Sequence, residues 1–202
     1  LYTYWLYDYA GVNPQNGNAL WRNEEGLLTE NYGEARRINA GSPEPLWTGG
    51  FNTELSWKGI SLGIQLEARY GNKVLNQDRS LFEADGSYGD SNIWKGAMNY
   101  WKKPGDTNVL PKPVYNNSSN SSAISTRYLE DGSYLRIKDI TLAYSLPSKW
   151  TKKALMSGVR IYASALNLYT FHNMNYWDPE HGTSGATIIS YPMTRSMIVG
   201  VD

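Results

Sequence analysis

The amino-acid sequence predicts an all-β protein whose antiparallel strands are long enough to cross a membrane as part of a β-barrel. Three observations support this fold class. Residues 59–70 alternate apolar and polar side chains without a break, the pattern of a strand with two unlike faces. The lengths of the predicted strands are close to the roughly 9–11 residues that a tilted strand needs to span a bilayer. The connections alternate between long and short, as in outer-membrane barrels.

The composition excludes several other classes of protein. Lys+Arg and Asp+Glu number 19 each, so the net charge is zero, whereas a nucleic-acid-binding protein normally carries a basic excess. Cys is absent, which excludes disulfide scaffolds, cysteine-zinc sites and thiol catalysis. The mean hydropathy is −0.53. A transmembrane helix needs about 20 consecutive apolar residues, and no apolar run in the sequence is nearly that long.

The elements follow in order along the chain. Residues 1–12 are β-prone by composition, although their two faces are ambiguous. Residues 51–57 and 59–70 form two alternating runs that meet at Lys58-Gly59, which predicts a tight hairpin. Residues 134–146 alternate with a phase slip at Lys138-Asp139, which predicts a β-bulge. Two further strands are predicted over residues 158–168 and 193–201.

The segments between these strands are of very unequal length. Long connections at 13–47, 71–132 and 169–191 alternate with shorter ones at 58–59 and 147–157. A connection of this length is unusual inside a compact soluble domain but ordinary on one side of an outer-membrane barrel. Short helices are predicted over 91–102, with Asp90 or Ser91 as its cap, and over 148–157.

The alternating strand over residues 59–70 supplies candidate residues for both faces of a barrel. Its apolar face predicts four lipid-facing residues: Ile60, Leu62, Ile64 and Leu66. Its other face predicts lumen-facing residues, among them Gln65, Glu67 and Arg69. In a soluble β-sandwich the apolar face would instead meet a second sheet. Strand length and loop asymmetry favour the membrane interpretation.

Aromatic residues fall in two kinds of place. Trp57 and Tyr70 lie at strand ends and suit the aromatic girdle at a bilayer interface, as do several rings within residues 2–9. The candidates for contact with a substrate or a partner lie in the long loops: Trp21, Trp94, Trp101, Tyr176 and Trp177. Exposed rings stack on sugar faces, but they also pack loops together. Packing is favoured for Trp94 and Trp101, which would share one side of the predicted helix.

No catalytic residues, metal site or cofactor are predicted. His172, Asp178, Glu180 and His181 cluster in one loop, but their spacing matches no ligand motif. Residues 85–90 contain two Asp and two Gly but lack the twelve-position spacing and closing Glu of a calcium loop. The chain has no Gly-x-Ser-x-Gly motif and no phosphate-binding loop.

Several segments together carry a family resemblance. Residues 131–147 (DGSYLRIKDITLAYSLP), 159–171 (VRIYASALNLYTF), Asp178-Pro179-Glu180 and residues 191–195 (YPMTR) closely resemble the C-terminal signature of the SusC/RagA-type TonB-dependent outer-membrane transporters. Residues 10–17 (AGVNPQNG) and 41–51 (GSPEPLWTGGF) match as well. The matching segments cover most of the chain in the right order.

The resemblance implies a fold and a place in a larger protein. A 22-stranded barrel is expected, of which residues 1–202 form one C-terminal part with about six strands. The plug, the TonB-box region and the earlier strands would lie outside this chain. Members of the family usually end in an aromatic residue, so this chain, ending at Asp202, is expected to stop a few residues early.

The resemblance also implies orientation, partners and function. The C-terminus would be periplasmic and the three long connections extracellular, in the outer membrane of a Gram-negative cell. The expected partners are a SusD-like lipoprotein over the extracellular mouth, the TonB complex, and outer-membrane lipid. The function would be import of oligosaccharides or peptides without bond chemistry. The alternatives are a soluble extracellular glycan-binding β-domain and, less favoured for lack of a carboxylate pair, a glycan-cleaving enzyme.

Overall fold

The computed structural model describes residues 2–87, 92–115, 119–180, 185–187 and 193–202. The chain divides into two compact units. The first unit comprises Leu1–Glu44, Lys73–Glu130 and His181–Ser190. The second comprises Pro45–Asn72, Asp131–Glu180 and Tyr191–Asp202. The boundaries show that segments far apart in sequence assemble into each unit.

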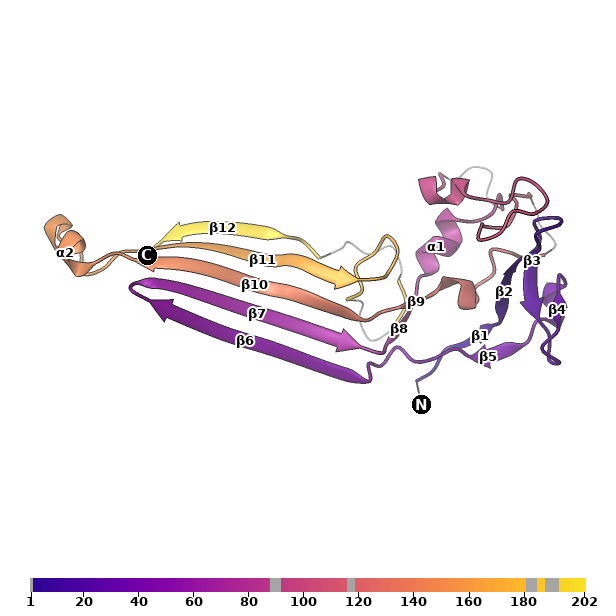
Figure 1. Ribbon diagram of the computed structural model, residues 1–202, viewed down its shortest axis with the longest axis horizontal. Coiled ribbons are helices and arrows are strands. Elements are labelled where there is room, and N and C mark those ends of the chain that lie inside the picture. The colour runs from indigo at the N-terminus through magenta and orange to yellow at the C-terminus, as the bar shows by residue number, and fades with distance from the viewer. Residues whose placement is uncertain (1, 88–91, 116–118, 181–184, 188–192) are drawn as a thin grey trace. The chain divides into compact units, whose positions relative to one another are not determined.

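The second unit is built on one antiparallel sheet of five strands (Figure 1). In spatial order the strands are β12 (Ser196–Val201), β11 (Arg160–His172), β10 (Tyr134–Ser145), β7 (Ile60–Tyr70) and β6 (Trp47–Trp57). β6 and β7 have 11 residues each and pair in register along their full length. The all-β fold class predicted from the alternation is confirmed.

The hairpin between β6 and β7 is the one predicted from the sequence. Its two residues, Lys58 and Gly59, both have positive φ, 48° and 88°. A two-residue turn of this kind matches the twist of the flanking strands and favours glycine. A Cβ on Gly59 would lie 2.8 Å from the carbonyl oxygen of Ser145, so this position also needs the small residue for close approach.

The predicted bulge in β10 is confirmed. The register of β10 shifts between Ile137 and Asp139 against both of its neighbours, β7 and β11. Against β7 the extra residue is Lys138, whereas against β11 two residues, Asn167 and Leu168, lie opposite this one. Such an insertion explains why the alternation of this strand changes phase in the sequence.

The register gives the sheet two faces of opposite character. The apolar face carries the side chains that pair across the strands as Phe51–Leu66, Leu55–Leu62, Trp57–Ile60, Ile64–Ile140, Leu142–Ala163 and Ala163–Val199. The polar face carries Thr48, Gly50, Asn52, Glu54, Ser56, Ser61, Gln65, Glu67, Arg69, Tyr134, Arg136, Asp139, Thr141, Tyr162 and Ser164. The predicted grouping of Ile60, Leu62, Ile64 and Leu66 on one face, opposite Gln65, Glu67 and Arg69, is therefore observed.

Residues 1–12 do not join this sheet, so it has five strands where about six were predicted. They form two short strands of the first unit, β1 (Trp5–Tyr7) and β2 (Tyr9–Val12), which pair with β5 (Arg37–Asn39) and β3 (Ala19–Arg22). The register of β2 shifts between Tyr9 and Gly11, and Gly11 has a φ of 114°. The two faces of residues 1–12 are ambiguous in the sequence because this segment forms two short strands, each with a different partner strand.

The first unit gathers the long connections into one folded body. Its other elements are β4 (Leu28–Thr29), the 3₁₀-helix η1 (Tyr32–Glu34), β8 (Lys73–Leu75), α1 (Gln77–Phe82), η2 (Lys95–Met98), η3 (Thr126–Tyr128) and β9 (Leu129–Asp131), which begins in this unit. Leu6, Leu75 and Tyr128 form its apolar core. The long connections thus have secondary structure and a core of their own, which the loop lengths did not predict.

The helices are shorter than predicted. Over 91–102 the described residues form only η2, whose N-cap residue Trp94 makes no side-chain capping bond, while Asp90 and Ser91 lie outside the described residues. The segment 148–157 forms α2 (Ser148–Thr151) and η4 (Lys152–Ala154) and ends at Leu155 in the left-handed conformation. The helix α1 was not predicted, and Asn76 caps it by accepting a hydrogen bond from the Arg79 backbone N–H.

Among the described residues, no helix has both the length and the apolar character needed to span a membrane.

Candidate functional site

The polar face of the sheet brings together a cluster of charged side chains of the second unit. Arg136 of β10 is its most buried member, with a side chain that is 0% exposed. Its guanidinium forms ion pairs with Asp178 and, at 2.6 Å, with Glu180. One carboxylate binds each of its two terminal nitrogens, an arrangement that the single ammonium group of a lysine could not reproduce. The loop after β11 is thereby fixed to the middle of the sheet.

Lys138, the bulged residue, extends this cluster across the face. Its ammonium group lies 3.1 Å from Glu180 and 3.0 Å from Glu67. The Tyr134 hydroxyl donates a hydrogen bond to Glu67 at 2.8 Å, and Arg69 lies 3.7 Å from the same carboxylate. Lys138 follows Arg136 by two residues and so points to the same face, toward both glutamates, while the bulge places the next residue, Asp139, on the polar face as well.

A groove of about 520 Å³ opens beside this cluster on β6 and β7. It is lined by Thr48, Gly50, Gln65, Glu67 and Arg69 among others. Gly50 pairs with Glu67 in the register, and its missing side chain leaves the space above the strand free. The groove presents an amide, a carboxylate and a guanidinium, which can bind polar groups of either charge.

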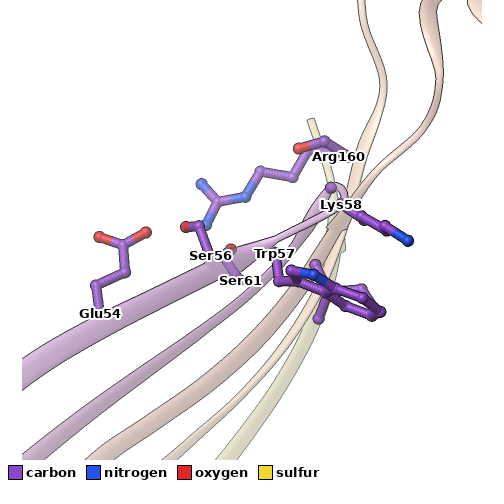
Figure 2. Close-up of a pocket in the computed structure, with 9 residues that line it drawn as sticks. Glu54, Ser56, Trp57, Lys58, Ser61 and Arg160 are labelled. Carbon is purple, nitrogen blue, oxygen red and sulfur yellow. The ribbon is translucent and has the colours of Figure 1, made fainter.

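A second polar hollow, of about 400 Å³, lies at the hairpin end of the sheet (Figure 2). Glu54, Ser56 and Ser61 line it from β6 and β7, and Arg160 lines it from β11. Figure 2 shows the Glu54 and Arg160 side chains pointing away from those of Trp57 and Lys58. The polar face thus has open, hydrogen-bonding surface at both ends.

The predicted lumen-facing residues Gln65, Glu67 and Arg69 all belong to this polar face. Sequence reasoning did not identify Arg136, Lys138 and Tyr134 as their neighbours. The alternation with Leu135 and Ile137 places Tyr134 and Arg136 on the face opposite the apolar side chains. The alternation does not give the register of β10 against β7, and that register decides which residues of the two strands are neighbours.

The five loop aromatics divide by burial. Trp21 is 0% exposed, and its indole N–H donates to the Ser119 carbonyl at 3.1 Å. Its ring packs edge-on against Tyr9 and Tyr32. A fully buried ring cannot stack on a ligand, so the proposed contact role of Trp21 is corrected to packing. The cause is that β3 places it inside the first unit.

The other four aromatics behave differently. Trp94 is half-buried and stacks on Phe82, with ring centroids 4.8 Å apart. Trp101 donates to the Pro14 carbonyl at 3.0 Å and covers Gly17. Both therefore pack loops, as favoured from the sequence, although they do not share one helix. Tyr176 is 56% exposed and Trp177 is half-buried.

The aromatic residues at the start of the chain also have a different place from the one predicted. Trp5, Tyr7 and Tyr9 belong to the first unit and not to strand ends of the five-stranded sheet. Burial raises the pKa of Tyr9 to about 12. Trp57 and Tyr70 do lie at opposite ends of the apolar face, where they are 68% and 63% exposed.

The first unit contains a buried ion-pair network that fixes its own carboxylates. Arg127 pairs with Asp85, and its guanidinium also lies 3.7 Å from Glu83. Arg79 binds Glu83 at 2.9 Å and Glu130 at 2.7 Å. Burial by itself lowers the pKa of Arg127, but the hydrogen bonds with Asp85 outweigh it and raise that pKa. Asp85 is therefore engaged by an arginine, which leaves the weak calcium-loop pattern of residues 85–90 without its first ligand.

The possible metal ligands near the C-terminus are also engaged. Asp178 and Glu180 both bind Arg136, and His172 is an exposed residue at the end of β11. His181 lies outside the described residues. The acidic residues of this loop thus serve to neutralise a buried guanidinium.

Comparison with known proteins gives a consistent set of relatives. No family model matches the chain. TonB-dependent receptor P3 of Formosa agariphila is 31% identical over 179 residues, which cover 83% of this chain and 17% of that receptor. TonB-dependent receptor P26 of the same organism is 27% identical over 207 residues, covering 96% of this chain and 19% of that receptor.

The solved structures agree. The structure of the RagAB peptide transporter matches with a TM-score of 0.83 and 30% identity, over 98% of this chain and 22% of the matched chain. The RagAB peptide importer in the "open-open" state matches with a TM-score of 0.83 and 29% identity, over the same shares of the two chains. The chain therefore spans about a fifth of the length of its relatives. The paired strands, the two-faced sheet and these matches together identify the chain as a member of the TonB-dependent receptors, of the SusC/RagA type.

Proposed function

We propose that this chain is part of the barrel wall of a TonB-dependent transporter that imports peptides or oligosaccharides across the outer membrane of a Gram-negative cell. The observation that carries the proposal is the two-faced sheet. Its apolar face exposes large side chains along all five strands: Phe51, Leu55, Trp57, Ile60, Leu135, Leu142, Tyr144, Ile161, Tyr169, Phe171, Met197, Val199 and Val201. Such a surface is unfavourable in water and suits lipid.

The strand dimensions support the same proposal. An 11-residue strand such as β7 spans about 37 Å at roughly 3.4 Å per residue. A tilt of about 40° reduces this to roughly 28 Å across the bilayer, close to the apolar band of outer-membrane barrels. Trp57 and Tyr70 near the two ends of the strands would then lie at the two interfaces.

The polar face would line the transport path. Transport in this proposal consists of binding and gated passage, with energy from TonB acting on a plug outside this chain. The groove beside Gln65, Glu67 and Arg69 can bind the charged ends and amides of a peptide, and RagAB is itself a peptide transporter. Exposed Tyr176 is the specific feature that favours an oligosaccharide, because a ring can stack on a sugar.

The orientation and the partners belong to the same proposal. The hairpin at Lys58-Gly59 and the turn at 147–157 would face the periplasm, together with the C-terminus. The first unit would then form extracellular loops that a SusD-like surface lipoprotein covers. The alternative, a soluble glycan-binding domain, would need a second layer over the apolar face, and in the part of the chain that the structure describes that face remains exposed.

Three measurements test the proposal. We expect it to fractionate with outer membranes and to need detergent to remain monodisperse. A strain lacking it should lose uptake of one class of nutrient, measured in parallel with labelled peptide mixtures and labelled oligosaccharides. A protein that stays monodisperse without detergent would contradict the barrel assignment and favour the soluble domain.

A further inference from the structure

The apolar face has a hollow of about 670 Å³ at its hairpin end. The hollow lies on the side of the sheet opposite the charged cluster. Its lining includes Ile60, Tyr144, Ile161, Ala163 and Val199, with Lys58 at its edge. The volume lies within the roughly 300–1,000 Å³ range of ligand-binding sites.

The register explains why this hollow exists. Ala163 of β11 lies between Leu142 of β10 and Val199 of β12. A methyl group between two larger apolar side chains leaves a depression along β11. The lining is almost entirely carbon, so the hollow suits a hydrocarbon chain and no polar ligand.

One end of the hollow is positively charged. The ammonium group of Lys58 lies 4.7 Å from the centre of the Trp57 ring, which holds the charge at the rim of the apolar surface. Figure 2 shows these two side chains at the tip of the hairpin. The neighbouring connection, residues 147–159, adds Lys149, Lys152 and Lys153 and contains no acidic residue. The charge at this end is therefore complementary to a phosphate.

We propose that this part of the apolar face binds one anionic phospholipid, with an acyl chain in the hollow and the headgroup phosphate at Lys58. The arrangement has the two features such a ligand needs, an apolar groove and a cation at the depth of the headgroups. The inference rests on the proposed function, because the hollow faces lipid only if the sheet is part of a barrel.

The test uses the full-length transporter, purified in detergent and stripped of lipid. Binding of phosphatidylglycerol and of phosphatidylcholine is measured by native mass spectrometry during titration. Lys58→Gln should weaken phosphatidylglycerol binding about fivefold, the contribution of one lysine near an anionic surface. Lys103→Gln, which removes an exposed lysine of the first unit, is its control and should leave the binding within error of the unmodified protein.

A second pair of variants tests the groove separately from the charge. Ala163→Leu should reduce binding of both lipids because its side chain fills the hollow. Ala165→Leu makes the same change two residues further along the same strand, outside the hollow, and should not reduce it. Heat-modifiable migration on a gel, which distinguishes a folded barrel from an unfolded chain, establishes that each variant is folded.

The outcomes separate this inference from the proposed function. Equal phosphatidylglycerol binding by the two lysine variants would overturn the role of Lys58, and equal binding by the two alanine variants would overturn the groove. In either case the protein would still need detergent and still transport. A protein that is monodisperse without detergent would instead overturn the barrel and, with it, this lipid site.

Discussion

Arg136 on β10 donates a hydrogen bond of 2.6 Å to Glu180, a residue 44 positions later in the chain. The arginine side chain is fully buried, and the same guanidinium also pairs with Asp178. A long-range contact of this kind ties the loop after β11 to the sheet. Burying either the Arg136 guanidinium or the Glu180 carboxylate alone would be costly, so the two groups stabilise each other.

The first prediction concerns this ion pair. Arg136→Met should lower the free energy of unfolding by about 3–5 kcal/mol, because it leaves Asp178 without its cation and Glu180 with Lys138 alone. The measurement is the temperature at which the folded barrel loses its heat-modifiable migration. Arg195→Met, at an exposed arginine, is the control and should have little effect. Equal melting of the two variants would show that the pair contributes nothing.

The second prediction distinguishes the two faces of β7. Leu62→Arg places a charge on the apolar face and should cost about 2–4 kcal/mol if that face meets lipid at mid-bilayer. Gln65→Arg places the same residue on the polar face and should be mild. The yield of folded protein in outer membranes measures both. Equal tolerance at the two positions would contradict the assignment of the faces.

The third prediction separates a packing aromatic from a contact aromatic. Trp21→Ala should destabilise the fold by about 3–5 kcal/mol, because it creates a cavity around a fully buried ring. Tyr176→Ala should cost much less stability than Trp21→Ala and reduce nutrient uptake, since this side chain is exposed. Uptake and melting are measured on both variants. Normal uptake by the Tyr176 variant would remove it from the substrate path.

The fourth prediction is a dependence on pH. The Glu30 carboxylate accepts hydrogen bonds from the side chains of Asn18, Asn16 and Asn13, at 2.7, 2.8 and 2.5 Å. These bonds hold its pKa below the usual 4.5. A lowered pKa stabilises the folded state above pH 4.5, and this contribution is lost as the pH falls through the folded-state pKa.

The corresponding experiment compares melting at pH 7 and at pH 3. Glu30→Gln should lower the melting temperature at pH 7 and make the difference between the two pH values smaller than in the unmodified protein. Glu24→Gln, at an exposed glutamate of the same connection, serves as the control. A pH difference that Glu30→Gln leaves intact would assign the acid sensitivity to other carboxylates.

The strands and their two faces could be predicted because their cause is local. Successive side chains of a strand point to opposite sides, so the alternation from Gly59 to Tyr70 already separates Leu62 from Gln65. The turn at Lys58-Gly59 and the bulge at Lys138 are local as well, since each breaks the alternation at a definite residue. These features need no knowledge of which strand lies beside which.

The partners of residues distant in sequence could not be predicted in the same way. Nothing in residues 1–12 shows that Leu6 pairs with Ile38, or that Trp21 is buried beneath the Ser119 carbonyl. Pattern reasoning therefore took the long connections as loops, whereas they fold together around Leu6, Leu75 and Tyr128. The charged cluster around Arg136 also depends on long-range contacts. A guanidinium buried in one strand is stable only where another segment supplies carboxylates, here Asp178 and Glu180 of the loop after β11. Local alternation fixes which way a side chain points, and long-range packing fixes what it meets.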